Sequence, residues 1–191
     1  MAHNPHRRTA GPDQAAPGRP VVHDLLPVAG VPMTLRAYLN TPEGLGYNLL
    51  DGLCCRDEPT VEHQAIVGNI IGLLQRYARG SGFGRALPAI NVDLGERNQP
   101  APDACLVSRE RCAALHGRAL HGIAPDLCVE VLSPSTAGYD RGHKAKLYAR
   151  HGCREYWIVD GRHRRVEVYR TGGHTAFCPG RRLRLRRGFP H

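Results

Sequence analysis

The sequence predicts an α/β (α+β) fold in which a mixed central β-sheet is flanked by helices. Between residues 60 and 80, apolar residues recur at spacings of three and four, the pattern of an amphipathic helix. Strand-like runs follow at 86–94, 103–108 and 126–133, and a second helical run at 138–152 precedes further strands. Because helices that alternate with blocks of strands must cover a shared surface, this order indicates a single mixed sheet with helices packed on it.

Two smaller elements are predicted ahead of the long helix. The segment VPMTLRAYLNTPEG (31–44) favours a short helix, and YNLLDGLCC (47–55) has the strand–turn–strand pattern of a hairpin that turns at Asp51-Gly52. The long helix is expected to use Thr60 as its N-cap and to end at Gly80.

After the second helical run the pattern is that of strands again. EYWIVD (155–160) and RRVEVYR (164–170) are predicted to be two strands joined by a tight turn, and HTAFC and RRLRLRR a final strand pair. Among all these runs, DLCVEVLS (126–133) is the most apolar, which is typical of a central strand.

Length and composition indicate one globular domain with a tail. Residues 1–30 are rich in Pro, Gly, Ala and polar residues, so we expect a disordered N-terminal arm, with the domain at 31–191. The N-terminus lacks the apolar core of a secretory signal, and no run approaches the length of a membrane span. Seven cysteines without CxxC spacing indicate a reducing cytoplasm and no zinc site.

The positive charge is concentrated towards the C-terminus. The chain has a formal net charge of +9, and the segment from Arg162 to Arg187 contains nine arginines against a single acid, Glu167. Such a local excess favours a polyanionic partner, nucleic acid before membrane. The alternative is a solvated arginine-rich hairpin without a partner.

Two carboxylates are candidates for a metal site. Glu130 lies in the middle of the apolar run DLCVEVLSPST, where an ionised carboxylate is costly unless a partner stabilises it. Asp103 opens the preceding strand-like run, so pairing of the two runs would bring the acids together. Two carboxylates and a backbone carbonyl are sufficient for Mg²⁺. The alternatives are an arginine partner for Glu130 and a turn role for Asp103 after Pro102.

Further candidates lie on the two predicted helices. Lys144 follows Asp140 by four residues on one helical face, and a lysine beside metal-bound carboxylates can orient water or stabilise a phosphorane. Glu62 and His63, in the first turn of the long helix, are candidate supporting residues. For each of these side chains the alternative is an ordinary helix-surface or ion-pair role.

Long motifs in the chain resemble the Uma-type restriction endonuclease family of the PD-(D/E)XK nuclease superfamily. They are Pro102-Asp103, APDLCVEVLSPST and YDRGHKAKLYARHGCREYWIVD, supported by YNLLDG and EHQAI, and they span residues 33–170. The resemblance implies a restriction-endonuclease-like core and Mg²⁺-dependent phosphodiester hydrolysis, with Mn²⁺ as a substitute ion. It also implies metal-binding acids at the positions of Asp103 and Glu130.

The chain departs from the superfamily motif at one catalytic position. The motif requires a lysine two residues after the glutamate, but Leu132 occupies that place. In this branch the helix lysine of a D-x-x-x-K pattern takes its role, which here corresponds to Asp140 through Lys144.

These observations predict a Mg²⁺-dependent endonuclease acting on nucleic acid, with DNA as the first choice, through Asp103, Glu130 and Lys144. A homodimer is expected because cutting both strands needs two sites. Two other classes remain open: a catalytically inactive nuclease-fold protein that binds nucleic acid, and a toxin-like or mobile-element protein that acts by binding a partner.

Overall fold

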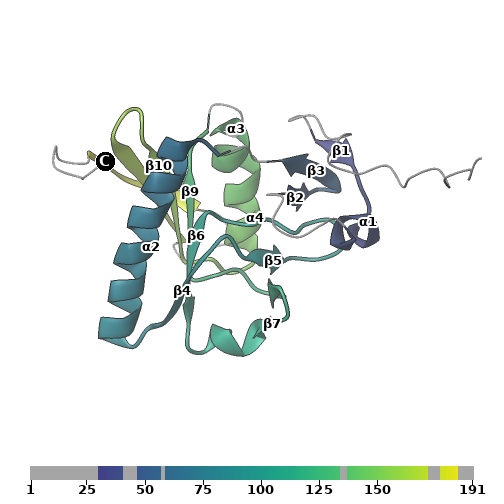
Figure 1. Cartoon of the computed structure of the whole chain (residues 1–191), viewed down its shortest axis with the longest axis horizontal. Coiled ribbons are helices and arrows are strands. Elements are labelled where there is room, and N and C mark those ends of the chain that lie inside the picture. Colours follow the sequence, from purple (N-terminus) through teal and green to yellow (C-terminus); the bar gives the residue numbers. More distant parts are fainter. Residues whose placement is uncertain (1–29, 41–46, 57–58, 134–136, 172–176, 185–191) are drawn as a thin grey trace, which may run out of the picture.

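The computed structural model describes residues 30–40, 47–56, 59–133, 137–171 and 177–184 of the chain (Figure 1). The predicted N-terminal arm therefore lies, apart from Gly30, outside the described residues. None of the described helices is long and apolar enough to cross a lipid bilayer.

A mixed six-stranded sheet forms the centre of the molecule, with the strand order β12-β11-β10-β9-β6-β4. Strands β9 and β10 run parallel, while the other neighbours are antiparallel. Every residue of β9 is buried, which confirms the central position predicted from its apolar run. The strands span Gly84–Pro88 (β4), Ala104–Ser108 (β6), Leu127–Val131 (β9), Glu155–Asp160 (β10), Arg165–Thr171 (β11) and Phe177–Arg184 (β12).

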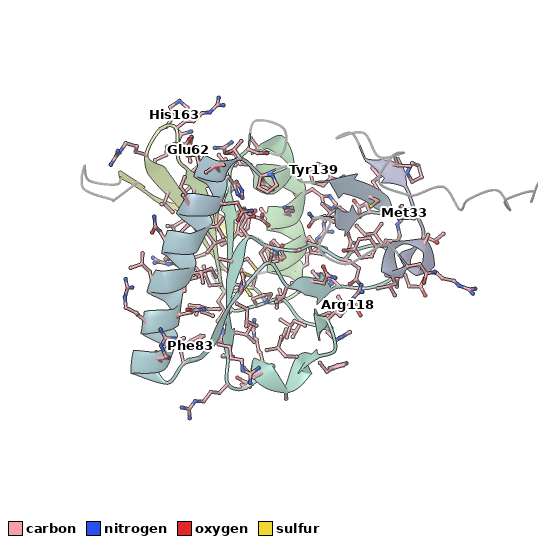
Figure 2. All side chains as sticks on the ribbon, in the orientation of Figure 1. Met33, Glu62, Phe83, Arg118, Tyr139 and His163 are labelled. Carbon is pink, nitrogen blue, oxygen red and sulfur yellow. The ribbon has the colours of Figure 1, made fainter. Side chains whose placement is uncertain are left out.

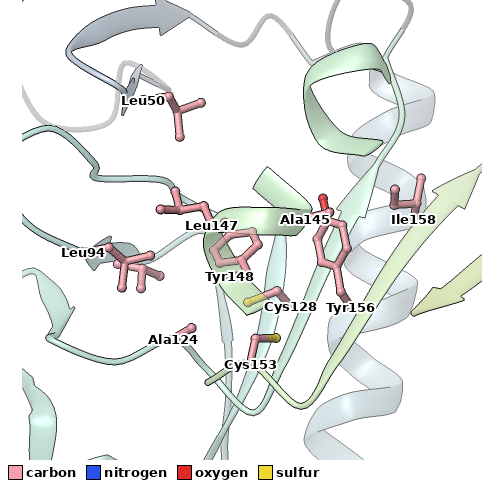
Figure 3. Close-up of a cluster of buried hydrophobic side chains, with 11 residues drawn as sticks. Leu50, Leu94, Ala124, Cys128, Ala145, Leu147, Tyr148, Cys153, Tyr156 and Ile158 are labelled. Atoms are coloured by element: carbon pink, nitrogen blue, oxygen red, sulfur yellow. The ribbon is translucent and has the colours of Figure 1, made fainter. Parts of the chain in front are cut away.

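Helices cover both faces of this sheet. Helix α2 (Val61–Ser81) lies on one face and α4 (Ala145–Arg150) on the other, with β6 and β9 between them (Figure 1). The core under α2 contains Val67, Leu74 and Val129. The core under α4 is more aromatic and thiol-rich (Figure 3), and its members include Cys128, Ala145, Leu147, Tyr148, Cys153, Tyr156 and Ile158.

The ends of α2 follow local capping chemistry. The Thr60 hydroxyl accepts a hydrogen bond from the His63 main-chain N–H at 3.2 Å, as expected for an N-cap. The predicted end at Gly80 is wrong by one residue: the helix continues through Ser81. Gly82 adopts the left-handed conformation (φ 65°, ψ 20°) that ends it.

The second helical run is not a uniform α-helix. A short α3 (Ala137–Tyr139) leads into the π-helical turn η3 (Asp140–Lys144), which continues into α4. Gly142 lies inside this wider turn. π-helical turns are rare and are frequently found at functional sites.

The run at 86–94 forms two strands, not the single strand predicted. The chain breaks at Ala89 (φ 22°), so that β4 stays in the central sheet while β5 (Asn91–Asp93) joins a second sheet. That sheet has the order β5-β8-β7, and its other strands are β7 (Leu115–His116) and β8 (Ala119–His121). The segment 109–125, which contains β7 and β8, also contains the 3-10 turn η2 (Arg111–Ala114).

The N-terminal elements form a small third sheet. The predicted hairpin is present as β2 (Tyr47–Leu50) and β3 (Leu53–Arg56), and Asp51 and Gly52 at its turn both have positive φ. Strand β1 (Val31–Pro32) pairs with β3, and the predicted short helix is α1 (Leu35–Leu39). His143 Nδ1 lies 3.2 Å from Asp51 Oδ2, so the hairpin tip contacts η3.

At the C-terminal end, the predicted strand pair is replaced by one continuous strand, β12, that pairs with β11. The parts of HTAFC and RRLRLRR that precede and follow β12 lie outside the described residues.

Gly84 in β4 is required by close main-chain packing. Its φ is 154°, and a Cβ at this position would lie 2.1 Å from the Val107 carbonyl oxygen. We expect Gly84→Ala to lower the free energy of unfolding by about 2–4 kcal/mol, measured by urea denaturation. The control is Gly68→Ala on the exposed face of α2, where a Cβ meets nothing within 4 Å. This change should stabilise the protein by about 0.5–1 kcal/mol, and equal effects at the two glycines would contradict the argument.

Candidate active site

The two candidate acids come together because β6 and β9 pair. Ala104 is opposite Val129 in this antiparallel register, so Asp103 and Glu130 occupy the next opposing position. Both lie at the end of the sheet where β9 and β10 finish and α2 begins. Figure 2 shows Glu62, Tyr139 and His163 near this same end of the molecule, whereas Phe83 marks the far end of α2.

Asp103 faces the start of α2. Its Oδ2 accepts a hydrogen bond from the Val131 N–H at 2.7 Å and lies 3.3 Å from His63 Nε2. The same His63 nitrogen lies 3.0 Å from the Val131 carbonyl oxygen. The Asp103 side chain is 23% exposed and that of His63 is 13% exposed. One carboxylate oxygen and one main-chain oxygen therefore converge on a single position that the imidazole nitrogen occupies.

Glu130 is buried and hydrogen-bonded at both oxygens. Lys144 Nζ donates to Oε2 at 3.0 Å, and the Tyr148 hydroxyl donates to Oε1 at 3.3 Å. The ammonium is the stabilising partner that a carboxylate in an apolar strand requires. Although Leu132 replaces the strand lysine, a lysine from the next helix reaches the glutamate.

Lys144 has a second carboxylate partner. Its Nζ lies 3.2 Å from Asp140 Oδ1, and both side chains are almost completely buried. The Tyr156 hydroxyl donates to the Asp140 main-chain oxygen at 3.1 Å, which helps to hold the wide turn of η3. The ammonium therefore lies between two buried acids, one from the central strand and one from the helical turn.

A second ion-pair group fixes η3 to the sheet. Arg141 donates two hydrogen bonds to Glu167 in β11, at 3.1 and 3.0 Å, and the Tyr169 hydroxyl donates to the same carboxylate at 2.9 Å. The hydrogen bond from Arg141 lowers the pKa of Glu167 below its ordinary value. Glu167 is opposite Ile158, which is opposite Glu130, so both glutamates lie in one row across the sheet.

Burial dominates the electrostatics of Glu130. Desolvation raises its pKa well above the ordinary value, the Lys144 ammonium opposes this shift, and the charges of Asp140 and Asp103 add to it. Burial likewise raises the pKa of the Tyr148 phenol, which therefore remains a hydrogen-bond donor at neutral pH.

The structure does not bring every candidate to this position. Glu62 is exposed, and its carboxylate points towards the turn after β10. A Cβ atom built on Gly161 in that turn would lie 3.9 Å from Glu62 Oε1. Lys146, two positions after Lys144, is exposed on α4 and does not share the buried position of Lys144. The arginines of the C-terminal segment are partly paired: Arg165 Nη2 lies 3.0 Å from Asp160 Oδ2 and Arg170 Nε lies 3.0 Å from Glu155 Oε2.

The donor set at Asp103 fits a divalent cation. Within the described part of the chain, no three His, Cys, Asp or Glu side chains are grouped to hold a metal ion. The convergence at Asp103 instead involves a main-chain oxygen, the Val131 carbonyl. Carboxylate and carbonyl oxygens are the ligands that hard cations such as Mg²⁺ prefer.

Sequence reasoning did not single out two groups that contact the candidate residues. Tyr148 follows Lys144 by four residues, and the same helical spacing that linked Lys144 to Asp140 could have indicated it. No sequence pattern marks the Val131 carbonyl, because every residue has a main-chain carbonyl. Its contact with His63 follows from its position at the end of β9.

The geometry places the chain in a structural class. A crystal structure with a similar fold is that of a "putative nuclease belonging to DUF820" from Anabaena variabilis. It has a TM-score of 0.65 and 22% sequence identity, and the match covers 74% of this chain and 81% of that one. At this identity the likeness concerns the fold, which is the nuclease-like α+β class. The comparison with curated proteins finds no match.

Sequence comparison identifies the family. The model of the Uma2 family, described as "Putative restriction endonuclease", matches residues 35–190. The chain belongs to this family, so the resemblance seen in its motifs is confirmed, and its function is nuclease-like.

The raised pKa of Glu130 predicts a pH-dependent stability. The folded protein holds this proton more tightly than the unfolded chain, whose glutamate titrates near 4.5. The stabilisation is complete below that pH and declines as the pH rises, by up to about 1.4 kcal/mol per pH unit. In EDTA, the free energy of unfolding of Glu130→Gln should therefore increase relative to that of the wild type between pH 5 and 7.

Denaturant titrations at each pH measure this difference, with exposed Glu96→Gln as the control for loss of a carboxyl. A gap between wild type and Glu130→Gln that stays constant with pH would mean that Lys144 keeps Glu130 ionised throughout.

Proposed function

We propose that this protein is a Mg²⁺-dependent endonuclease that hydrolyses phosphodiester bonds in nucleic acid, with DNA as the preferred substrate. Asp103 and Glu130 would hold the cation, for which Mn²⁺ can substitute, and Lys144 would act on the attacking water or the transition state. Membership of a restriction-endonuclease family and the nuclease-like fold support the reaction class.

The single observation that carries the proposal is the position of Lys144. Its ammonium lies 3.0 Å from Glu130 Oε2 although it comes from η3 and not from β9. A lysine missing from the strand would otherwise favour an inactive member of the family. The contact supports a complete acid–acid–lysine set assembled from two elements.

The residues have distinct chemical tasks in this proposal. Asp103 is the more exposed acid and can face both cation and substrate, whereas Glu130 is almost completely buried. A bound divalent cation supplies charge neutralisation at the phosphate and lowers the pKa of a coordinated water. Lys144, held by Asp140, keeps a fixed positive charge at the site, where it can orient the water or stabilise the developing phosphorane charge.

Substrate contacts would come from the edge of the sheet. Strands β11 and β12 belong to the arginine-rich segment 162–187; β11 lies beside β10, and β12 forms the edge of the sheet beyond β11. Phosphate contacts by arginine make binding strongly salt-dependent. We also propose that two copies act together on a duplex, because each site would cut one strand.

Cleavage of supercoiled plasmid in Mg²⁺, Mn²⁺ or EDTA tests the proposal. We expect metal-dependent nicking that falls by about 10²–10⁴-fold in both Asp103→Ala and Lys144→Ala. Lys146→Ala is the matched control, since it removes an exposed lysine two positions away and should retain activity.

Loss of Lys144 leaves two buried acids without the ammonium group that they share and can cost about 3–5 kcal/mol of stability. Asp103→Asn keeps a side-chain oxygen that can still accept the hydrogen bond from the Val131 N–H, at a partly exposed position, and therefore provides the catalytic test in a folded protein. Wild-type protein that binds DNA in a salt-sensitive way without cutting it would instead indicate an inactive binding module. Co-purification with a partner chain and no affinity for DNA would favour the partner-binding class.

A further inference from the structure

The turn between β10 and β11, residues 161–164, begins close to the candidate site. In the register of the parallel strands, Val159 of β10 is opposite Val131 of β9, and the Val131 N–H donates to Asp103. Asp160, the last residue of β10, is one position further on. Because neighbouring strands lie about 4.8 Å apart and Asp103 is on the other side of β9, the turn starts about 10 Å from that acid.

The same turn packs against the first turns of α2. A Cβ on Gly161 would lie 2.5 Å from Ile66 Cδ1 and 3.9 Å from Glu62 Oε1. Figure 2 shows His163 of the turn and Glu62 of the helix at one end of the molecule. The turn is therefore held against the helix end that also faces Asp103.

Hydrogen bonds within the turn fix its shape. The Asp160 carboxylate accepts from the His163 N–H at 3.0 Å and lies 2.9 Å from His163 Nδ1. Its Oδ2 also lies 3.0 Å from Arg165 Nη2, which offsets its charge. Arg164 has a positive φ of 51°, and its N–H donates to the Gly161 carbonyl oxygen at 3.3 Å. The acid that begins the turn is thus used inside it.

Arg162 is exposed in this turn. Among the described residues no carboxylate forms an ion pair with it, whereas Arg165 and Arg170 of β11 are paired with Asp160 and Glu155. A guanidinium that is always charged and lies in water on a fixed turn is well suited to bind a phosphate.

We propose that the β10–β11 turn is a phosphate-contact surface, in which Arg162 binds a backbone phosphate close to the one that is cut and Glu62 limits the affinity. The inference rests on the proposed function and assigns the contact to one turn of the arginine-rich segment. One strand of a duplex carries a phosphate about every 3.4 Å along its axis, so about 10 Å corresponds to about two or three nucleotides from the cut. Glu62 is exposed beside the turn, and its charge opposes a phosphate there.

Binding of a short labelled DNA duplex in EDTA, measured by fluorescence anisotropy across about 50–200 mM salt, tests the inference. Arg162→Ala should bind every sequence more weakly, and the slope of log affinity against log salt should become shallower by about 1. Arg79→Ala is the matched control, because it removes an exposed arginine from the last turn of α2, about 25 Å along the helix from Glu62. It should keep the wild-type slope.

Glu62→Gln should change the affinity in the opposite direction. Removal of its charge should tighten binding by about two- to fivefold, the effect of one exposed charge on a neighbouring one. Glu96→Gln, which removes another exposed carboxylate, should bind as the wild type does. Equal tightening in both variants would indicate an effect of net charge alone and would overturn the role given to this turn.

Replacement of single phosphates by uncharged methylphosphonates locates the contact. After the cut has been mapped on the same duplex, one replacement within a few nucleotides of it should weaken binding by the wild type but not by Arg162→Ala. If the only replacement with this behaviour lies far from the cut, Arg162 does not contact the strand beside the site, and the inference is wrong.

The outcomes separate this inference from the proposed function. Plasmid nicking by the wild type, with unchanged affinity and slope in Arg162→Ala or an equal loss in Arg79→Ala, would overturn the contact and leave the endonuclease intact. The expected binding pattern without nicking in Mg²⁺ or Mn²⁺ would support the contact while the proposed reaction fails. Absence of any affinity for nucleic acid would overturn both.

Discussion

The ammonium of Lys144 between the carboxylates of Glu130 and Asp140 is the interaction on which the candidate site depends. It gives the Glu130 carboxyl a hydrogen-bonding partner in the middle of the most buried strand of the sheet. Buried ion pairs of this kind contribute little net stability, because desolvation offsets their attraction, but they are costly to break. The fold therefore keeps a cluster that adds little net stability, a feature that is common at functional sites.

The surrounding structure is organised to hold that ammonium in place. The π-helical turn η3 carries both Asp140 and Lys144, and its neighbour Arg141 is bound to Glu167 on the far side of β10. The aromatic core below α4 contributes two hydroxyl groups, from Tyr148 to Glu130 and from Tyr156 to η3. Polar contacts at the end of the sheet near the candidate site and apolar packing under α4 thus constrain the same short segment, η3.

Patterns in the sequence were sufficient where local chemistry decides the structure. The Thr60 cap, the Asp51-Gly52 turn and the apolar run of β9 were all predicted, because each depends on side chains adjacent along the chain. Prediction failed where distant packing decides: the run at 86–94 divides between two sheets, and η3 interrupts a helix of ordinary appearance.

The sequence by itself determined the family, the mixed sheet with its flanking helices, and the residue types available for chemistry. It singled out Asp103, Glu130 and Lys144, since an acid in an apolar strand and a D-x-x-x-K pattern are visible without coordinates. Only the tertiary structure decided that Lys144 reaches Glu130, that His63 lies against Asp103 and that Glu62 does not. The reason is physical: these contacts depend on strand register and on the width of one helical turn, which are set by packing across the sheet and not by any local pattern.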